Sequence, residues 1–112
     1  MGNYINEKDA MARLGNNKKL YGRLLAQFDG VKMLDALKAA VSSGDAAGAQ
    51  AQAHAIKGLA ANLSLQELCE KAGAIELALK KSGAVDGVDT DGISAAAAAT
   101  AEAVKAWLSE NP

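Results

Sequence analysis

Apolar residues recur at three- and four-residue intervals along this chain, and that spacing restricts what it can fold into. The clearest case is the series Leu65, Leu68, Ala72, Ile75 and Leu79. A 3-4-3-4 spacing places these side chains along one side of an α-helix, as in the packing seam of a bundle. Half of the 112 residues are hydrophobic but only 4% are aromatic, and much of the hydrophobic share is alanine, the best helix former. The sequence therefore predicts an all-α fold in one domain, residues 1–112.

Capping and turn residues divide the chain into six expected helices. Asn6 is a suitable N-cap for a short first helix, and helices are expected over residues 18–28, 31–41, 46–63 and 92–109. Asp45 can cap the helix that begins at residue 46. The segment Ser64-Leu65-Gln66-Glu67 matches a capping box and predicts a further helix with Ser64 as its N-cap. Short connections favour an antiparallel four-helix bundle with one or two short N-terminal accessory helices.

The chain contains a single histidine, His54, inside the helix expected over residues 46–63. At about 100° per residue, Ile56 and Leu63 fall on the opposite side of this helix, so His54 is expected to project outward from the bundle. The residues on its own face are small or uncharged: Ala47, Gln50, Ala51, Gly58 and Ala61. A solvated helix face usually carries several charged side chains. A smooth surface of this kind is suited to docking a protein partner.

The residues one turn after His54 indicate what chemistry it could perform. A histidine can act as a neutral nucleophile near pH 7. Lys57, at i+3, can offset the charge of an anion on the ring, and Gly58, at i+4, leaves room for a partner to approach. Gln50 could hydrogen-bond the ring or a bound phosphate. Together they indicate a histidine that carries a phosphoryl group.

The segment His54-Ala55-Ile56-Lys57-Gly58, followed by Leu59-Ala60-Ala61-Asn62-Leu63, resembles the signature of histidine-containing phosphotransfer (HPt) domains. The resemblance extends to Leu14, Leu20 and Phe28 before this motif and to Leu68-Cys69 and Ile75-Glu76 after it. Ser64 is a departure, because many members have glycine there. The resemblance implies a bundle that carries phosphoryl groups in multistep, two-component phosphorelays.

By this resemblance, His54 would accept a phosphoryl group from a receiver-domain aspartate and pass it to another receiver, with Lys57 stabilising the phosphate charge. Gly58, Gln50, Ala47, Ala51 and Ala61 would form the docking surface. The partners would be response-regulator receiver domains, a hybrid sensor histidine kinase, or both. No intrinsic cofactor or metal is expected, because a divalent metal would come from the receiver. The sequence also lacks a phosphate-binding loop for ATP, so a carrier is expected and not a kinase.

Charge and cysteine content limit other readings. The net charge of −1 and the scattered basic residues argue against nucleic-acid binding. A single cysteine, Cys69, and the lack of a long apolar segment or signal peptide lead us to expect a cytoplasmic protein without membrane contact. The main alternative is a non-catalytic helical adaptor that docks receivers without transfer. A metal or redox bundle is less favoured, because one histidine and one cysteine cannot complete a zinc site.

Overall fold

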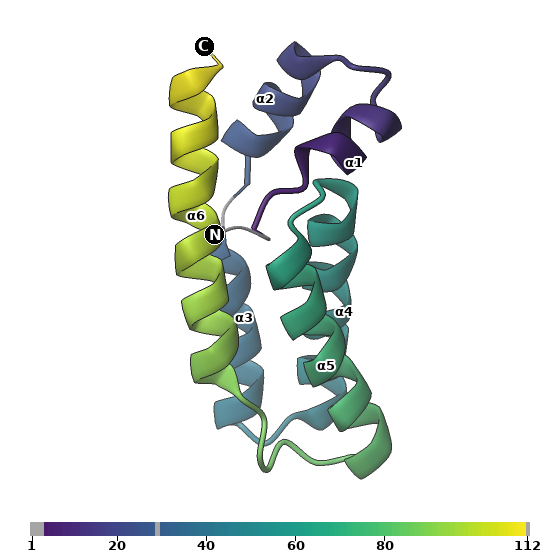
Figure 1. The fold of residues 1–112 in the computed structure, drawn as a ribbon. Helices are drawn as coiled ribbons and strands as arrows, with labels where there is room; N and C mark the ends of the chain where they lie inside the picture. The colour runs from purple at the N-terminus through teal and green to yellow at the C-terminus, as the bar shows by residue number, and fades with distance from the viewer. Residues whose placement is uncertain (1–3, 29, 112) are drawn as a thin grey trace.

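The computed structural model describes residues 4–28 and 30–111, and over those ranges the regular structure is helical throughout (Figure 1). The helices are α1 (Glu7–Arg13), α2 (Lys18–Ala26), α3 (Gly30–Ser42), α4 (Ala46–Asn62), α5 (Gln66–Ser82) and α6 (Thr90–Glu110). The prediction of an all-α fold is confirmed. Residues 1–3, 29 and 112 of the expected domain lie outside the described residues.

The four longest helices form a bundle. Each contacts two others, in the order α3, α4, α5, α6 and back to α3, and α4 lies beside α5 in Figure 1. Because three residues join α3 to α4 and three join α4 to α5, consecutive helices run in opposite directions. The interior is filled by large apolar side chains that are almost fully buried, among them Leu37, Ile56, Leu65, Leu68, Leu79 and Ile93. This core packs α4 and α5 against each other.

Side-chain caps set the start of most helices. Asn6 accepts a hydrogen bond from the Asp9 backbone at 3.1 Å and Asp45 accepts one from the Gly48 backbone at 2.9 Å, which confirms both expected caps. The last helix begins at Thr90, two residues before its expected start. The reason is Asp89, whose carboxylate accepts a hydrogen bond from the Gly92 backbone at 2.7 Å.

The predicted capping box at Ser64 is wrong. Helix α5 has Leu65 as its N-cap, with no side-chain capping bond. Ser64 has φ +56°, in the left-handed region that favours glycine. Its hydroxyl donates a 2.7 Å hydrogen bond to the Asp9 carboxylate, and its carbonyl accepts one from the Asn6 backbone at 2.9 Å. Bonding to Ser64, together with Arg13, lowers the pKa of Asp9. The turn after α4 is thereby attached to the N-terminal region.

Helix α2 supports the same turn from another side. Tyr21 is fully buried, and its hydroxyl donates a 2.5 Å hydrogen bond to the carbonyl of Leu63, the C-cap residue directly after α4. The Tyr21 ring also packs edge-on against Trp107 of α6, with ring centroids 5.1 Å apart. The short helices therefore close one end of the bundle, where α4 ends.

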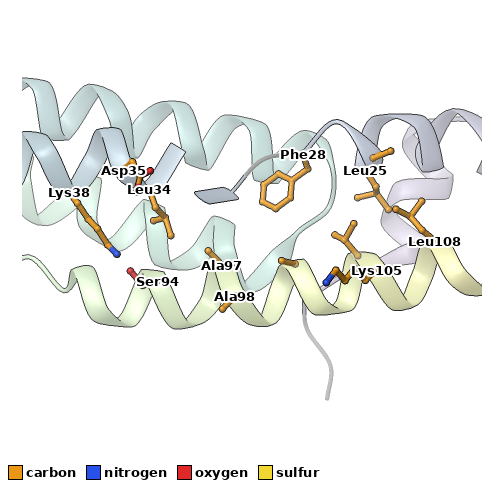
Figure 2. A pocket seen from close by; sticks show the side chains of 13 residues that line it. Leu25, Phe28, Leu34, Asp35, Lys38, Ser94, Ala97, Ala98, Lys105 and Leu108 are labelled. Atoms are coloured by element: carbon orange, nitrogen blue, oxygen red, sulfur yellow. The ribbon is translucent and has the colours of Figure 1, made fainter. Parts of the chain in front are cut away.

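A mostly apolar groove runs between α6 and the α2–α3 region (Figure 2). Leu25, Phe28, Leu34 and Leu108 form much of its walls, and Lys38 extends toward Ser94 at one end. The lining residues contain none from α4 or α5. This groove is therefore separate from the surface that carries His54.

Candidate functional site

His54 lies on the outer face of α4. Its side chain is 72% exposed, while Ala49, Ala53, Ile56 and Ala60 of the same helix are buried. The helical period places these four side chains against the bundle and turns position 54 away from them. The expectation that His54 projects outward is confirmed.

A carboxylate from the neighbouring helix holds the imidazole. Glu76 of α5 approaches His54, and its Oε2 lies 2.8 Å from Nδ1 of the ring. The Glu76 side chain is only 7% exposed, which is rare for a glutamate without partners. The contact joins two helices across 22 residues of sequence. Glu76 is therefore a site residue that the sequence analysis missed.

One signal in the sequence pointed to Glu76. It follows Ile75 and lies four residues after Ala72, both of which belong to the apolar seam of α5. A glutamate at the edge of a packing seam needs a hydrogen-bond partner or a cation when it is buried. Its partner could not be read from the sequence, because it belongs to another helix.

Two lysines complete the surroundings of Glu76. The Lys57 ammonium lies 3.6 Å from Oε1 and the Lys80 ammonium lies 3.8 Å from Oε2. Both lysine side chains are about half exposed, so solvent weakens these ion pairs. The hydrocarbon stem of Lys57 passes over Gly73 of α5, with Cδ 3.6 Å from where a Cβ would lie. Both cations therefore reach the same carboxylate as the imidazole.

The electrostatics fix which nitrogen of His54 carries a proton. Burial acts to raise the pKa of Glu76, but the hydrogen bond with His54 and the nearby charges outweigh it and lower that pKa. Glu76 is thus ionised at neutral pH and can only accept a hydrogen bond. Nδ1 must be the donor, so in the neutral ring Nε2 holds the lone pair. Within the described chain Nε2 has no hydrogen-bond partner.

The surface beside His54 is low and open. A shallow hollow is lined by Ala47, Gln50, Ala51, His54, Glu76 and Lys80. Ala47, Ala51 and Gly58 are exposed, whereas Gln50 and Ala61 are partly covered. Beyond the adjacent residues and the local helix backbone, a Cβ added at Gly58 would meet no atom within 4 Å, so packing does not require glycine there. Gln50 lies beside His54 but makes no hydrogen bond to the ring.

The arrangement suits attack on an anionic electrophile. The Nε2 side of the imidazole is presented to solvent, and the Glu76 carboxylate lies at the other ring nitrogen, where it can balance a positive charge that develops on the ring. Two ammonium groups are close enough to attract an anion. Among residues 4–28 and 30–111, no group of three or more His, Cys, Asp or Glu side chains could hold a metal ion.

Comparison with known proteins adds an independent line of evidence. A family model described as the Hpt domain matches residues 26–108, a range that contains α4, α5 and all three groups around Glu76. No curated protein and no solved structure matches the chain. No helix in the described ranges combines the length and the apolar character needed to cross a membrane.

Proposed function

The chain belongs to the Hpt domain family, whose members carry phosphoryl groups in phosphorelays, and on that premise we propose that His54 is the residue that is phosphorylated. It accepts the group from the aspartyl phosphate of one receiver domain and passes it to an aspartate of another. The observation that carries this proposal is the 2.8 Å contact of Nδ1 with Glu76, combined with an exposed ring. It leaves Nε2 as the free nucleophile.

The transfer step follows from that geometry. The lone pair of Nε2 attacks phosphorus in line with the departing oxygen, so that an N–P bond forms and the aspartyl O–P bond breaks. The receiver aspartate leaves as a carboxylate. The ring keeps its proton on Nδ1 and becomes a cation, which the Glu76 carboxylate stabilises at hydrogen-bond distance. In the second transfer, attack by another aspartate returns the electron pair to Nε2 and restores the neutral ring.

Lys57 and Lys80 would stabilise the phosphoryl oxygens. Each ammonium already lies within 4 Å of Glu76. Lys57 is one helical turn after His54, and Lys80 is one helical turn after Glu76. A phosphoryl group on Nε2 brings more negative charge than the single carboxylate, so the flexible lysine side chains can turn toward it. A divalent metal ion would come with the acidic pocket of the receiver.

The docking surface is assigned to Gly58 and the small residues around His54. Ala47, Ala51 and Gly58 are exposed and lack bulky or charged groups, and Gln50 and Ala61 complete the face. A receiver must bring its aspartate within bonding distance of Nε2, which a flat surface allows. The proposed partners are receiver domains of response regulators or of a hybrid sensor kinase, in the cytoplasm.

The direct test is incubation with a phosphorylated receiver. We expect the chain to gain phosphate that is labile in acid and stable in base, as a phosphoramidate is. His54→Gln, with its helicity verified by circular dichroism, should gain none. Labelling that survives in His54→Gln would refute the site. Binding to receivers without any transfer by the wild-type chain would instead support the adaptor alternative.

A second experiment tests Glu76 as a positioning residue. Glu76→Gln keeps an oxygen that can accept from Nδ1 but removes the charge, whereas Glu76→Leu removes both. We expect Glu76→Gln to slow phosphorylation by about ten- to a hundredfold, because a hydrogen bond to a charged group is worth about 1.5–3 kcal/mol, and Glu76→Leu to slow it further. Nitrogen NMR should show phosphate on Nε2 alone in the wild type and on both ring nitrogens in Glu76→Leu. Unchanged rates in both variants would contradict this role.

A further inference from the structure

Among the described residues, Leu77 is the one large hydrophobic residue that is mostly open to solvent, at 54% exposed. A single exposed leucine is ordinary on a protein surface. This one follows directly after Glu76, the carboxylate that holds the proposed phosphorylation site. The position of Leu77 beside the proposed phosphorylation site, and not its exposure alone, therefore makes it a candidate for contact with a partner.

Helix geometry places Leu77 on the same side of the molecule as His54. Gly73 precedes Leu77 by four residues and Lys80 follows by three, so both lie beside it on α5. The Lys57 stem crosses Gly73 from α4, and Lys80 shares a hollow with His54. The α5 residues Gly73, Leu77 and Lys80 therefore continue the surface that α4 presents around His54.

This extension differs in character from the α4 part of the surface. Apart from Lys57, the exposed residues of α4 around His54 are mainly alanine and glycine, which contribute little apolar area to a contact. Leu77 adds a larger apolar group, and Lys57 and Lys80 lie nearby on the same surface. A protein partner that matches this surface needs an acidic pocket opposite Lys57 and Lys80 and an apolar patch, beside that pocket, opposite Leu77.

We propose that Leu77 is an apolar anchor for the receiver domain that transfers phosphate to or from His54. The inference rests on the proposed function and extends the docking surface from α4 to α5. The receiver's acidic pocket supplies the charge complement to Lys57 and Lys80 when it approaches the ring. Leu77 then becomes buried against the receiver surface beside that pocket, and this burial stabilises the complex without touching the reacting atoms.

The size of the effect follows from the exposed area. Complete burial of a leucine side chain strengthens an association by about tenfold or more, and here about half of the side chain remains to be covered. Its replacement by asparagine also places a polar amide in the contact. We therefore expect about a tenfold loss of affinity for the receiver.

The test compares Leu77→Asn with Ala78→Asn in the full chain. Both positions are exposed on α5, so the two changes have similar effects on the helix. Ala78 instead lines a separate hollow with Val88 and Asp89. The receiver is the one from the same organism that gives the fastest transfer to the wild-type chain. Transfer is measured over a range of carrier concentrations, and labelling by phosphoramidate, a small donor that needs no docking surface, is measured in parallel.

We expect Leu77→Asn to need about ten times more protein for half-maximal transfer, with the maximal rate unchanged. Ala78→Asn should behave as the wild type, and all three proteins should react equally with phosphoramidate. If Leu77→Asn and the wild type reach half-maximal transfer at the same concentration, Leu77 is not an anchor for the receiver. The proposed function would remain intact. If the wild type accepts phosphate from no receiver, the proposed function fails and the anchor fails with it.

Discussion

The hydrogen bond between Tyr21 and Leu63 supports the end of the helix that carries His54, and its removal should have a measurable cost. Tyr21→Phe keeps the ring and its edge-on contact with Trp107 but deletes the donor to the Leu63 carbonyl. The bond is buried, so the carbonyl loses its partner without gaining water. We expect the free energy of unfolding near neutral pH to fall by about 1–2 kcal/mol.

The pH dependence of this loss provides a sharper test. Burial raises the pKa of Tyr21 from 10.0 to about 12, with smaller contributions from the charges of Glu7 and Asp9. Between those pH values the unfolded chain releases the phenolic proton and the folded chain retains it, so stability falls as the pH rises. The wild type therefore loses about 2 kcal/mol or more over this interval through Tyr21. Tyr21→Phe has no proton to release there.

Urea denaturation of both proteins, followed by far-ultraviolet circular dichroism and by the fluorescence of Trp107, measures the difference at each pH. Because every other side chain is the same in both proteins, subtracting the two curves leaves the contribution of Tyr21. We expect the stability gap to close between pH 10 and about 12. A gap that stays constant over this range would refute the reasoning, since the hydroxyl would then be equally protonated in the folded and unfolded chains.

Three further outcomes are expected. Gly58→Ala and Gly58→Leu should both fold and gain up to about 1 kcal/mol of stability, because a Cβ at this position contacts no other part of the chain. In transfer assays, only Gly58→Leu should lose more than about tenfold in receiver-dependent labelling. Equal transfer by both variants would contradict the docking role. Ser64→Gly should be more stable than Ser64→Ala by about 1 kcal/mol in urea denaturation, because φ is +56°; the reverse order would show that the left-handed backbone carries no cost. Folding lowers the pKa of Glu76 from 4.5, so the ionised carboxylate stabilises the fold above about pH 4.5. This stabilisation is lost as the pH falls through the pKa that Glu76 has in the folded chain. Glu76→Gln should therefore show a shallower acid limb in unfolding followed by circular dichroism, and an unchanged limb would count against the ion pairs.

Much of the helical framework follows from signals that act over a few residues. Asn6 and Asp45 cap helices because their side-chain oxygens reach a backbone N–H three residues away, a contact that needs no other part of the chain. The direction of His54 follows equally from the 3.6-residue period, which places the buried alanines and Ile56 opposite it. These local features were predicted correctly from the sequence alone.

Ser64 and Glu76 show where such reasoning stops. The S-x-x-E pattern matched a capping box, but Ser64 bonds instead to Asp9, which is 55 residues away, and its backbone adopts a left-handed conformation. Glu76 could be placed on α5 beside the packing seam, but its pairing with His54 depends on how α5 is rotated and shifted against α4. Many combinations of rotation and shift satisfy the same apolar pattern.

The amino-acid order by itself determined six helices, most of their ends and the outward side of α4, because caps and periodicity depend on near neighbours. Only the packed bundle decided that a nearly buried carboxylate holds Nδ1 of His54 and that two lysines share it. Those contacts join groups on separate helices. Hydrogen bonds form over about 3 Å, so their existence depends on packing distances that no local pattern encodes.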